Sequence, residues 1–243
     1  MRAYFNKLAR DVEQKKALPL IYPLLLALIA GSIFSLSLAP FEQWYIALLS
    51  PALLYAALHK RPARQALAIG LSYGIGLWFV GAFWLYTSIH VYGDTAAPLA
   101  ILMIAIMAVI MGLFSALQAW SYRRFFPETP LTFAPLWVMF EWAKTWVFTG
   151  FPWLFAGYAF TGYFLDSYAP LFGVFGVSFV VIILACALVE LCRKRFIWVV
   201  PSVVLLIGAW VASQLEFVKP SASKPLSVSL IQGNIPQDLK WLT

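Results

Sequence analysis

Charged side chains are scarce in this chain: Asp, Glu, Lys and Arg make up 11% of its 243 residues, whereas 63% are hydrophobic. A soluble domain of this length would not need so much apolar surface and could not keep it in water. The hydrocarbon core of a bilayer is the solvent that suits such a composition. The shortage of charge therefore excludes an ordinary soluble domain and predicts an all-α polytopic membrane protein.

Cysteine and histidine are also rare, with two of each. Cys186 and Cys192 lie six residues apart in one apolar stretch, so on a helix they stand about 9 Å apart along the axis and point in different directions. We interpret them as packed helix cysteines, with a reactive Cys192 beside Arg193 as the alternative. His90 and Asp94 are too few to hold a metal ion. We therefore expect no metal site and no cofactor.

Seven long apolar stretches fill most of the chain, and a helix needs about 20 such residues to cross roughly 30 Å of hydrocarbon. The seven predicted transmembrane helices cover residues 20–38, 41–58, 66–89, 98–120, 131–148, 172–191 and 196–212. The second is the weakest, because Glu42 lies at its start and Pro51 predicts a kink within it. On the third, Gly70 and Gly74 have the spacing of closely packed membrane helices.

Lys and Arg are missing from the first, third and fifth connections, which carry Glu42, Asp94 and Asp166 instead. The basic residues lie on the other side: Arg2, Lys7, Arg10, Lys15 and Lys16 in the N-terminal arm, Lys60, Arg61 and Arg64 in the second connection, Arg123 and Arg124 in the fourth, and Arg193, Lys194 and Arg195 in the sixth. Because positive charge stays on the cytoplasmic side during insertion, we predict a cytoplasmic N-terminus and an external C-terminal tail. The basic side chains behind the net charge of +7 therefore lie where they can contact anionic lipid headgroups. The charge does not indicate nucleic-acid binding.

The segment 149–171 is aromatic and apolar enough to be an eighth crossing. Such a crossing would move the basic residues 193–195 outside and break the alternation of charge. We therefore place this segment as a lipid-skimming loop at the outer surface.

The composition changes after the seventh stretch. We predict a cytoplasmic arm at 1–19, a seven-helix transmembrane domain at 20–213, a linker at 214–225 and the start of a second domain at 226–243. Leu226, Val228 and Leu230 alternate with serines, which is the pattern of a β-strand. Because one strand is not stable alone, we expect the second domain to be external and truncated after its first strand.

Four stretches of the chain resemble the membrane half of the apolipoprotein N-acyltransferase family. They are Leu-Ala-Pro-Phe-Glu-Gln-Trp at 38–44, Trp-Leu-Tyr-Thr-Ser-Ile at 84–89, Thr-Gly-Phe-Pro-Trp-Leu at 149–154 with Gly157 and Tyr158 shortly after, and Asn-Ile-Pro-Gln-Asp-Leu-Lys-Trp at 234–241. The last two are the most specific. The resemblance implies seven transmembrane helices, an external α/β nitrilase-like domain and a final span, of which this chain holds only the first half.

The resemblance also implies a chemistry. A cysteine of a Glu–Lys–Cys triad takes an acyl chain from a phospholipid as a thioester, and the α-amine of a diacylglyceryl-cysteine apolipoprotein accepts it. The expected partners are a membrane phospholipid as acyl donor and a diacylated apolipoprotein as acceptor, for a monomer in the bacterial inner membrane. None of the triad residues can be placed in this sequence, so we expect the chain alone to lack acyltransferase activity.

Aromatic residues at the outer surface are the first candidates for lipid binding. Phe151 and Trp153 lie in the aromatic segment, and Trp84 and Tyr86 end the third stretch at the same surface. They form either an aromatic belt at the level of the headgroups or the wall of an entrance through which acyl chains leave the bilayer.

Glu141 and Lys144 are the second pair of candidates, three residues apart on one face of the fifth helix near its outer end. Ionisable groups inside a membrane are functional candidates by default. They form either a structural ion pair or a headgroup site. Arginine is common in the family at the position of Lys144, and lysine cannot make the bidentate contact that arginine makes with phosphate. Trp241 is either part of the substrate-proximal segment that the resemblance implies or a core aromatic.

Two other functions fit the composition. A small transporter would need charged groups at mid-membrane in several helices, or an internal repeat, but only Glu141 and Lys144 are found and no repeat. A non-enzymatic scaffold would bind a partner through the outer tail, and it fits if the protein ends at residue 243. We prefer the membrane module of an acyltransferase.

Overall fold

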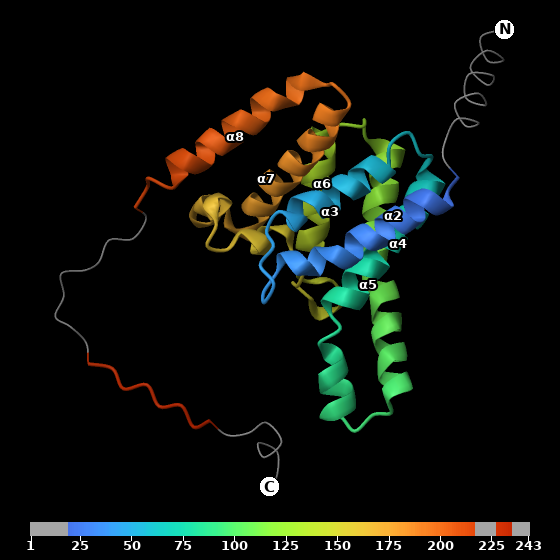
Figure 1. Cartoon of the computed structure of the whole chain (residues 1–243), viewed down its shortest axis with the longest axis vertical. Helices are drawn as coiled ribbons and strands as arrows, with labels where there is room; N and C mark the ends of the chain where they lie inside the picture. The colour runs from blue at the N-terminus through green and yellow to red at the C-terminus, as the bar shows by residue number, and fades with distance from the viewer. Residues whose placement is uncertain (1–18, 217–226, 235–243) are drawn as a thin grey trace.

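The computed structural model describes residues 19–216 and 227–234, and all regular secondary structure in these residues is helical (Figure 1). The seven α-helices of this part are α2 (Ile21–Phe34), α3 (Ile46–Ala57), α4 (Ala63–Gly81), α5 (Ala97–Phe125), α6 (Pro130–Ala143), α7 (Ala169–Cys192) and α8 (Val199–Ala212). Each overlaps one of the seven predicted stretches, so the prediction of an all-helical domain is confirmed for the described residues.

Two helical segments are long and apolar enough to cross a membrane. They are α5 (Ala97–Phe125) and Phe164–Cys192, which joins the short helix η5 (Phe164–Tyr168) to α7, and each has 29 residues. At 1.5 Å per residue, α5 is about 43 Å long, more than the roughly 30 Å of a hydrocarbon core. The second segment is kinked at Gly173, where φ is 64°. The other helices are shorter than predicted. The helix α3 has 12 residues, which is about 18 Å.

The predicted helix ends were wrong where the backbone turns left-handed. The second helix begins at Ile46 rather than at 41, because Pro40 and Glu42 (φ 55°) lie in a turn. The helix α6 ends at Ala143, the backbone leaves the helical conformation at Trp146 (φ −137°), and Phe148 (φ 54°) and Thr149 (φ 70°) prevent the helix from resuming before the predicted end at 148. Such φ values cannot continue a right-handed helix.

The third predicted stretch is also interrupted. The helix α4 ends at Gly81, and a separate π-helical turn, η2 (Thr87–Val91), follows before α5.

Glycines allow α4 to pack closely on both of its neighbours. A Cβ atom on Gly31 of α2 would lie 2.0 Å from the carbonyl oxygen of Tyr73, and one on Gly74 would lie 2.5 Å from the Cα of Gly112 on α5. A Cβ atom on Gly70 would lie 2.3 Å from the carbonyl oxygen of Ser115 on α5. The close packing predicted for Gly70 and Gly74 is thus confirmed, and it fixes α4 as the central helix.

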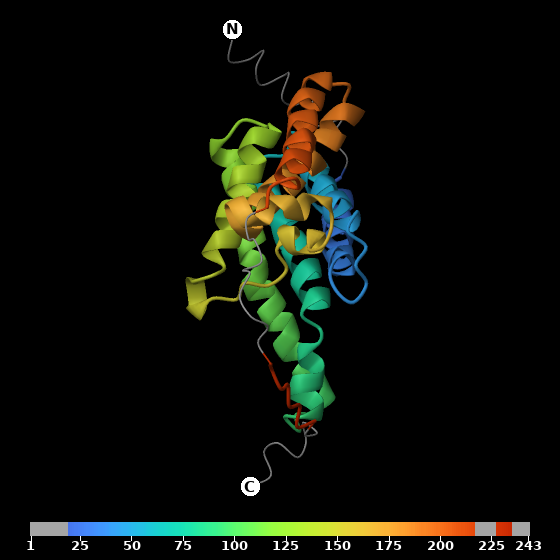
Figure 2. The ribbon, with the colours of Figure 1, turned by 90° about the vertical axis from the view of Figure 1, so that its left-hand side faces the viewer.

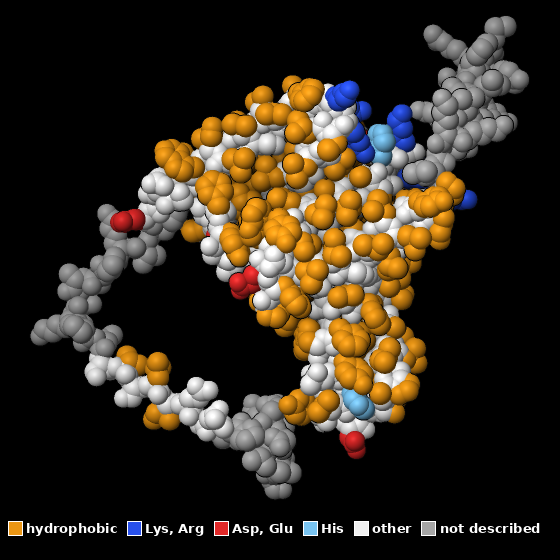
Figure 3. Space-filling model, in the orientation of Figure 1, with side chains coloured by type: hydrophobic (Ala, Val, Ile, Leu, Met, Phe, Trp, Pro, Cys, Tyr) orange, Lys and Arg blue, Asp and Glu red, His pale blue; other side chains and the backbone are white. Residues whose placement is uncertain are grey.

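One end of the molecule is basic. Figure 3 shows Lys and Arg side chains gathered there beside a His, whereas hydrophobic side chains cover most of the visible face. Glu190 of α7 is fully buried at this end, where its carboxylate accepts hydrogen bonds from Arg193 (2.7 Å), Arg195 (3.0 Å) and the Tyr55 hydroxyl (2.9 Å). Glu128 pairs with Arg123 and with His59. These contacts tie the connections α3–α4, α5–α6 and α7–α8 together.

The aromatic segment between α6 and α7 forms no eighth long helix, as predicted. It consists of short 3₁₀ turns, among them η4 (Ala156–Phe160), and it lies against α7 and α8 (Figures 1 and 2). The expectation of a segment that only skims lipid needs correction, because Phe155, Ala156 and Phe160 are buried in protein. The Gly157 amide donates to the Ser178 hydroxyl of α7 at 2.8 Å, which anchors the segment.

The tail differs from its prediction. Residues 227–234 form neither helix nor strand, so the strand predicted at 226–230 is not found in the described part of it. A strand needs a neighbouring strand to accept and donate its ladder hydrogen bonds, and the described residues contain no strand that could supply them. Trp241, most of the arm 1–19 and most of the linker 214–225 lie outside the described residues.

Candidate functional site

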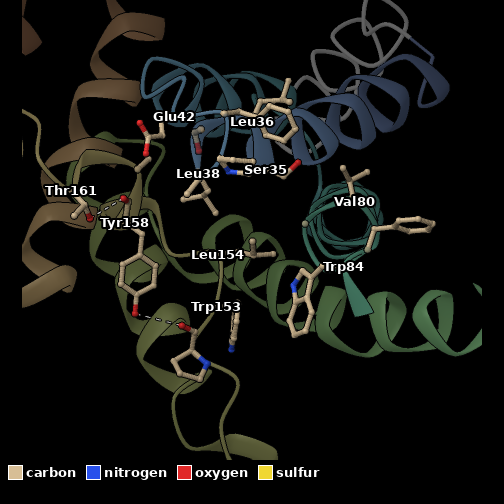
Figure 4. Close-up of a pocket in the computed structure, with 18 of the residues that line it drawn as sticks. Ser35, Leu36, Leu38, Glu42, Val80, Trp84, Trp153, Leu154, Tyr158 and Thr161 are labelled. Atoms are coloured by element: carbon tan, nitrogen blue, oxygen red, sulfur yellow. Dashed lines mark hydrogen bonds between the residues drawn. The ribbon is translucent and has the colours of Figure 1, made fainter. Parts of the chain in front are cut away.

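A cavity of about 1040 Å³ opens where three segments that are distant in sequence come together (Figure 4). The first segment follows α2, the second is the C-terminal end of α4 with the turn after it, and the third is the aromatic segment before α7. The lining residues are Ser35, Leu36, Ser37, Leu38, Ala39, Pro40, Phe41, Glu42, Phe79, Val80, Gly81, Phe83, Trp84, Pro152, Trp153, Leu154, Tyr158, Ala159, Thr161 and Tyr163. A volume of this size and an apolar lining are typical of sites for hydrophobic ligands.

Stacked aromatic rings build one wall of the cavity. Trp84 stacks on Trp153 with ring centroids 5.1 Å apart, and Trp153 stacks on Phe151 at 5.7 Å. Phe151 packs in turn on Trp78 at 5.2 Å. Trp84 and Trp153 are each 46% exposed and Trp78 is 1% exposed, so the stack runs from the surface into the core. Such a stack is rigid and presents a flat apolar face to a ligand.

The turn after α2 forms the facing wall. The Glu42 amide donates to the Leu38 carbonyl at 3.0 Å, and the Trp44 amide donates to the Glu42 carbonyl at 2.9 Å. The Tyr163 hydroxyl donates to the same Glu42 carbonyl at 3.3 Å. Trp44 also packs on Phe160, with ring centroids 5.7 Å apart. These contacts fix the first outer connection against the aromatic segment.

The predicted aromatic residues divide into two groups. Trp84 and Trp153 line the cavity, and Phe151 stacks on Trp153 without being part of the lining. Tyr86 is not in the lining. It stacks on Phe83, which is, with ring centroids 5.5 Å apart.

Glu141 and Lys144 lie together in the protein interior, 2% and 7% exposed, and they do not line the cavity. Their contacts differ from the direct ion pair that the spacing suggested. The Glu141 carboxylate accepts hydrogen bonds from Trp137 Nε1 and from the Ala156 amide, both at 2.8 Å. The Lys144 ammonium lies over the rings of Phe155 (5.1 Å) and Trp78 (5.6 Å).

These contacts join α6 to the aromatic segment behind the cavity. The Lys144 carbonyl adds a third connection, because it accepts a hydrogen bond from the Phe151 amide at 2.7 Å. Glu141 and Lys144 therefore hold the segment that carries Trp153 and Leu154 in place. Their geometry supports a positioning role, because both side chains contact the aromatic segment and neither lines the cavity.

Sequence reasoning missed the residues that the turn after α2 contributes, including Leu36, Leu38, Phe41 and Glu42. The signal was present, because the stretch 38–44 was one of the four that carried the family resemblance. Its acidic residue stands in an otherwise apolar run, and such an isolated charge can be found from the sequence.

The described residues contain no group of three or more His, Cys, Asp or Glu side chains that could hold a metal ion. Cys186 is buried within α7, and Cys192 is exposed at the end of that helix. Neither cysteine lines the cavity.

Comparison with known proteins identifies the family to which these segments belong. Residues 30–187 match the family model described as the apolipoprotein N-acyltransferase N-terminal domain. The chain is 41% identical over 228 residues to the apolipoprotein N-acyltransferase of Azotobacter vinelandii, covering 89% of this chain and 44% of the relative. It is 37% identical over 227 residues to that of Coxiella burnetii, covering 89% of this chain and 47% of the relative.

The match to the apolipoprotein N-acyltransferase of Ralstonia nicotianae extends over 99% of this chain and 49% of the relative, at 34% identity over 257 residues. The chain thus spans about half the length of the curated relatives it matches. The family match covers the turn after α2, the end of α4 and the aromatic segment, which together form the cavity. The chain belongs to the apolipoprotein N-acyltransferase family, and its residues 30–187 match the N-terminal domain of that family.

Proposed function

We propose that this chain is the membrane module of a phospholipid:apolipoprotein N-acyltransferase, and that its cavity admits an acyl chain from the bilayer. The observation that carries the proposal is the convergence of three segments, each containing a stretch of the family resemblance, on one apolar cavity. The donor would be a membrane phospholipid and the acceptor a diacylated apolipoprotein, in keeping with the name of the relatives.

The acyl transfer itself would proceed through a cysteine thioester, which the family resemblance implies. Neither Cys186 nor Cys192 fits that role, because one is buried and the other lies at the basic end, outside the cavity lining. We therefore expect the purified chain to transfer no acyl group to a diacylated lipopeptide. Transfer by the chain alone, and its loss in Cys192→Ser, would contradict this.

Substitution of Trp153 tests whether the cavity admits an acyl chain. Trp153→Ala removes the ring between Trp84 and Phe151, and we expect about tenfold weaker binding of a phospholipid with a fluorescent acyl chain, which corresponds to about 1.4 kcal/mol of lost contact. Binding is measured with the purified protein in detergent micelles. Trp146→Ala is the matched control, because Trp146 is exposed at the end of α6 and does not line the cavity. Equal binding by both variants would favour a plain aromatic belt.

We also propose that the chain crosses the membrane seven times, with the short helices completing each crossing together with the residues that flank them, and with the basic end in the cytoplasm. The native cysteines allow a direct test, because Cys192 is exposed at the basic end and Cys186 is buried. A membrane-impermeant maleimide should label Cys192 in inside-out vesicles and leave it unlabelled in intact spheroplasts. Cys192→Ser should abolish the labelling. Labelling from outside the cell would overturn the proposed orientation.

A further inference from the structure

The cavity has one charged side chain in its lining. Among the lining residues, all of which belong to the described part of the chain, Glu42 is the only Asp, Glu, Lys, Arg or His. Figure 4 shows Glu42 at one edge of the cavity, with Trp84 and Trp153 toward the opposite edge. The cavity therefore has a negatively charged side and an aromatic side.

The protein fixes the backbone of Glu42 and leaves its carboxylate exposed. The left-handed conformation (φ 55°) and the hydrogen bond from Tyr163 to its carbonyl hold the residue in its turn. The nearby hydroxyls are already used within the protein: Thr161 donates to the Tyr158 carbonyl at 3.0 Å, and Ser37 donates to the Phe34 carbonyl at 2.6 Å. The carboxylate is thus the group at this edge best suited to a polar ligand.

The shape and charge together select one class of ligand. An apolar cavity binds an acyl chain, and a single carboxylate beside it attracts a cation and repels an anion. A primary ammonium group also donates up to three hydrogen bonds, which a carboxylate accepts in a short, charge-assisted geometry. An amphiphile with an acyl chain and an ammonium group matches both parts of the cavity.

We propose that Glu42 binds the primary ammonium group of the amphiphile whose acyl chain occupies the cavity. The inference rests on the proposed function of the cavity and adds the residue that binds the polar group of the ligand. The ammonium group could be that of a phospholipid headgroup or the α-amine of a diacylated lipopeptide, which share this chemistry.

Binding of two simple probes tests the role of Glu42. Dodecylamine is protonated at pH 7 and dodecanol is uncharged, and we expect the protein in micelles to prefer the amine by about tenfold, the effect of one charge-assisted hydrogen bond. Glu42→Gln should bring that preference close to one while dodecanol still binds. Asp94→Asn is the matched control, because Asp94 is an exposed acid with a left-handed backbone (φ 48°) outside the cavity lining. An unchanged preference in Glu42→Gln would overturn the inference.

The same experiment separates this inference from the proposed function. If dodecanol binding does not weaken in Trp153→Ala, the proposed cavity function fails whatever Glu42 does. If Trp153→Ala weakens both probes and Glu42→Gln changes neither, the cavity function stands and the role of Glu42 is refuted.

A second set of measurements identifies the source of the ammonium group. Phosphatidylethanolamine is compared with its N-acetylated form, and a diacylated lipopeptide with its N-acetylated form. We expect acetylation of the true ligand to weaken binding to the native protein and to have no effect in Glu42→Gln. No effect of either acetylation on the native protein would contradict the proposal.

Discussion

Replacing Glu141 with alanine is expected to destabilise the protein by about 3–5 kcal/mol, because the change breaks a buried charged network by removing one partner. The Glu141 carboxylate accepts hydrogen bonds from Trp137 and from the Ala156 amide. Without it, both N–H groups lose their acceptor in a buried site. The Lys144 ammonium would then remain among the rings of Trp78 and Phe155 with no nearby carboxylate. Equilibrium unfolding in mixed micelles measures the loss.

Two further variants separate charge from hydrogen bonding. Glu141→Gln keeps an oxygen acceptor of nearly the same shape, so we expect it to cost less, about 1.5–3 kcal/mol. Adding Lys144→Met to Glu141→Ala removes the uncompensated charge and should recover part of the stability. If the single alanine variant unfolds within about 0.5 kcal/mol of the native protein, the network does not hold the aromatic segment.

The same substitution has a consequence for ligand binding. Glu141 does not line the cavity, but the segment that it holds carries Trp153 and Leu154, which do. We therefore expect Glu141→Ala to weaken acyl-chain binding under conditions where the variant is still folded. A positioning role would raise the dissociation constants of dodecylamine and dodecanol together, whereas loss of a headgroup contact would affect only the amine.

The helices could be predicted from the sequence because their apolar stretches are long and uninterrupted. Their ends could not, because several depend on single residues in left-handed conformations. Phe148 and Thr149 end the helical stretch after α6, although neither is Gly or Pro. Non-glycine residues rarely adopt this conformation, so the residue types gave no warning.

The candidate site was predictable only in part for a similar reason. Phe151, Trp153 and Trp84 stand out in the sequence as aromatics near the ends of apolar stretches, and the structure brings them together. The partners of Glu141 could not be found from spacing alone. The i, i+3 rule points to Lys144, whereas the main-chain partner is Ala156, fifteen residues further along and on a different element. Glu42 was overlooked because its place in the cavity lining depends on walls that come from two other segments.

One added methyl group between α4 and α5 is also expected to destabilise the protein strongly. Gly74→Ala would place a Cβ atom 2.5 Å from the Cα of Gly112, a backbone atom that cannot move without its helix. The two helices must then separate along an interface that also includes Gly70 and Ser115. Overpacking of this kind costs about 1–3 kcal/mol and occasionally more, and loss of close contact removes the van der Waals attraction that holds membrane helices together.

Gly112→Ala, at the facing position, is the matched control. A Cβ atom there would lie 3.2 Å from its nearest neighbour, the Ile75 amide nitrogen, so a shift of a few tenths of an ångström accommodates it. Both changes replace glycine with alanine inside a helix, and the gain in helix propensity of about 1 kcal/mol is therefore the same in each. The difference between the two free energies of unfolding isolates the packing, and we expect Gly74→Ala to be less stable by about 2–3 kcal/mol. Equal stabilities in mixed micelles would show that α4 and α5 are not held at this distance. The turn after α4, which carries Trp84, would then lack the rigid support on which the cavity depends.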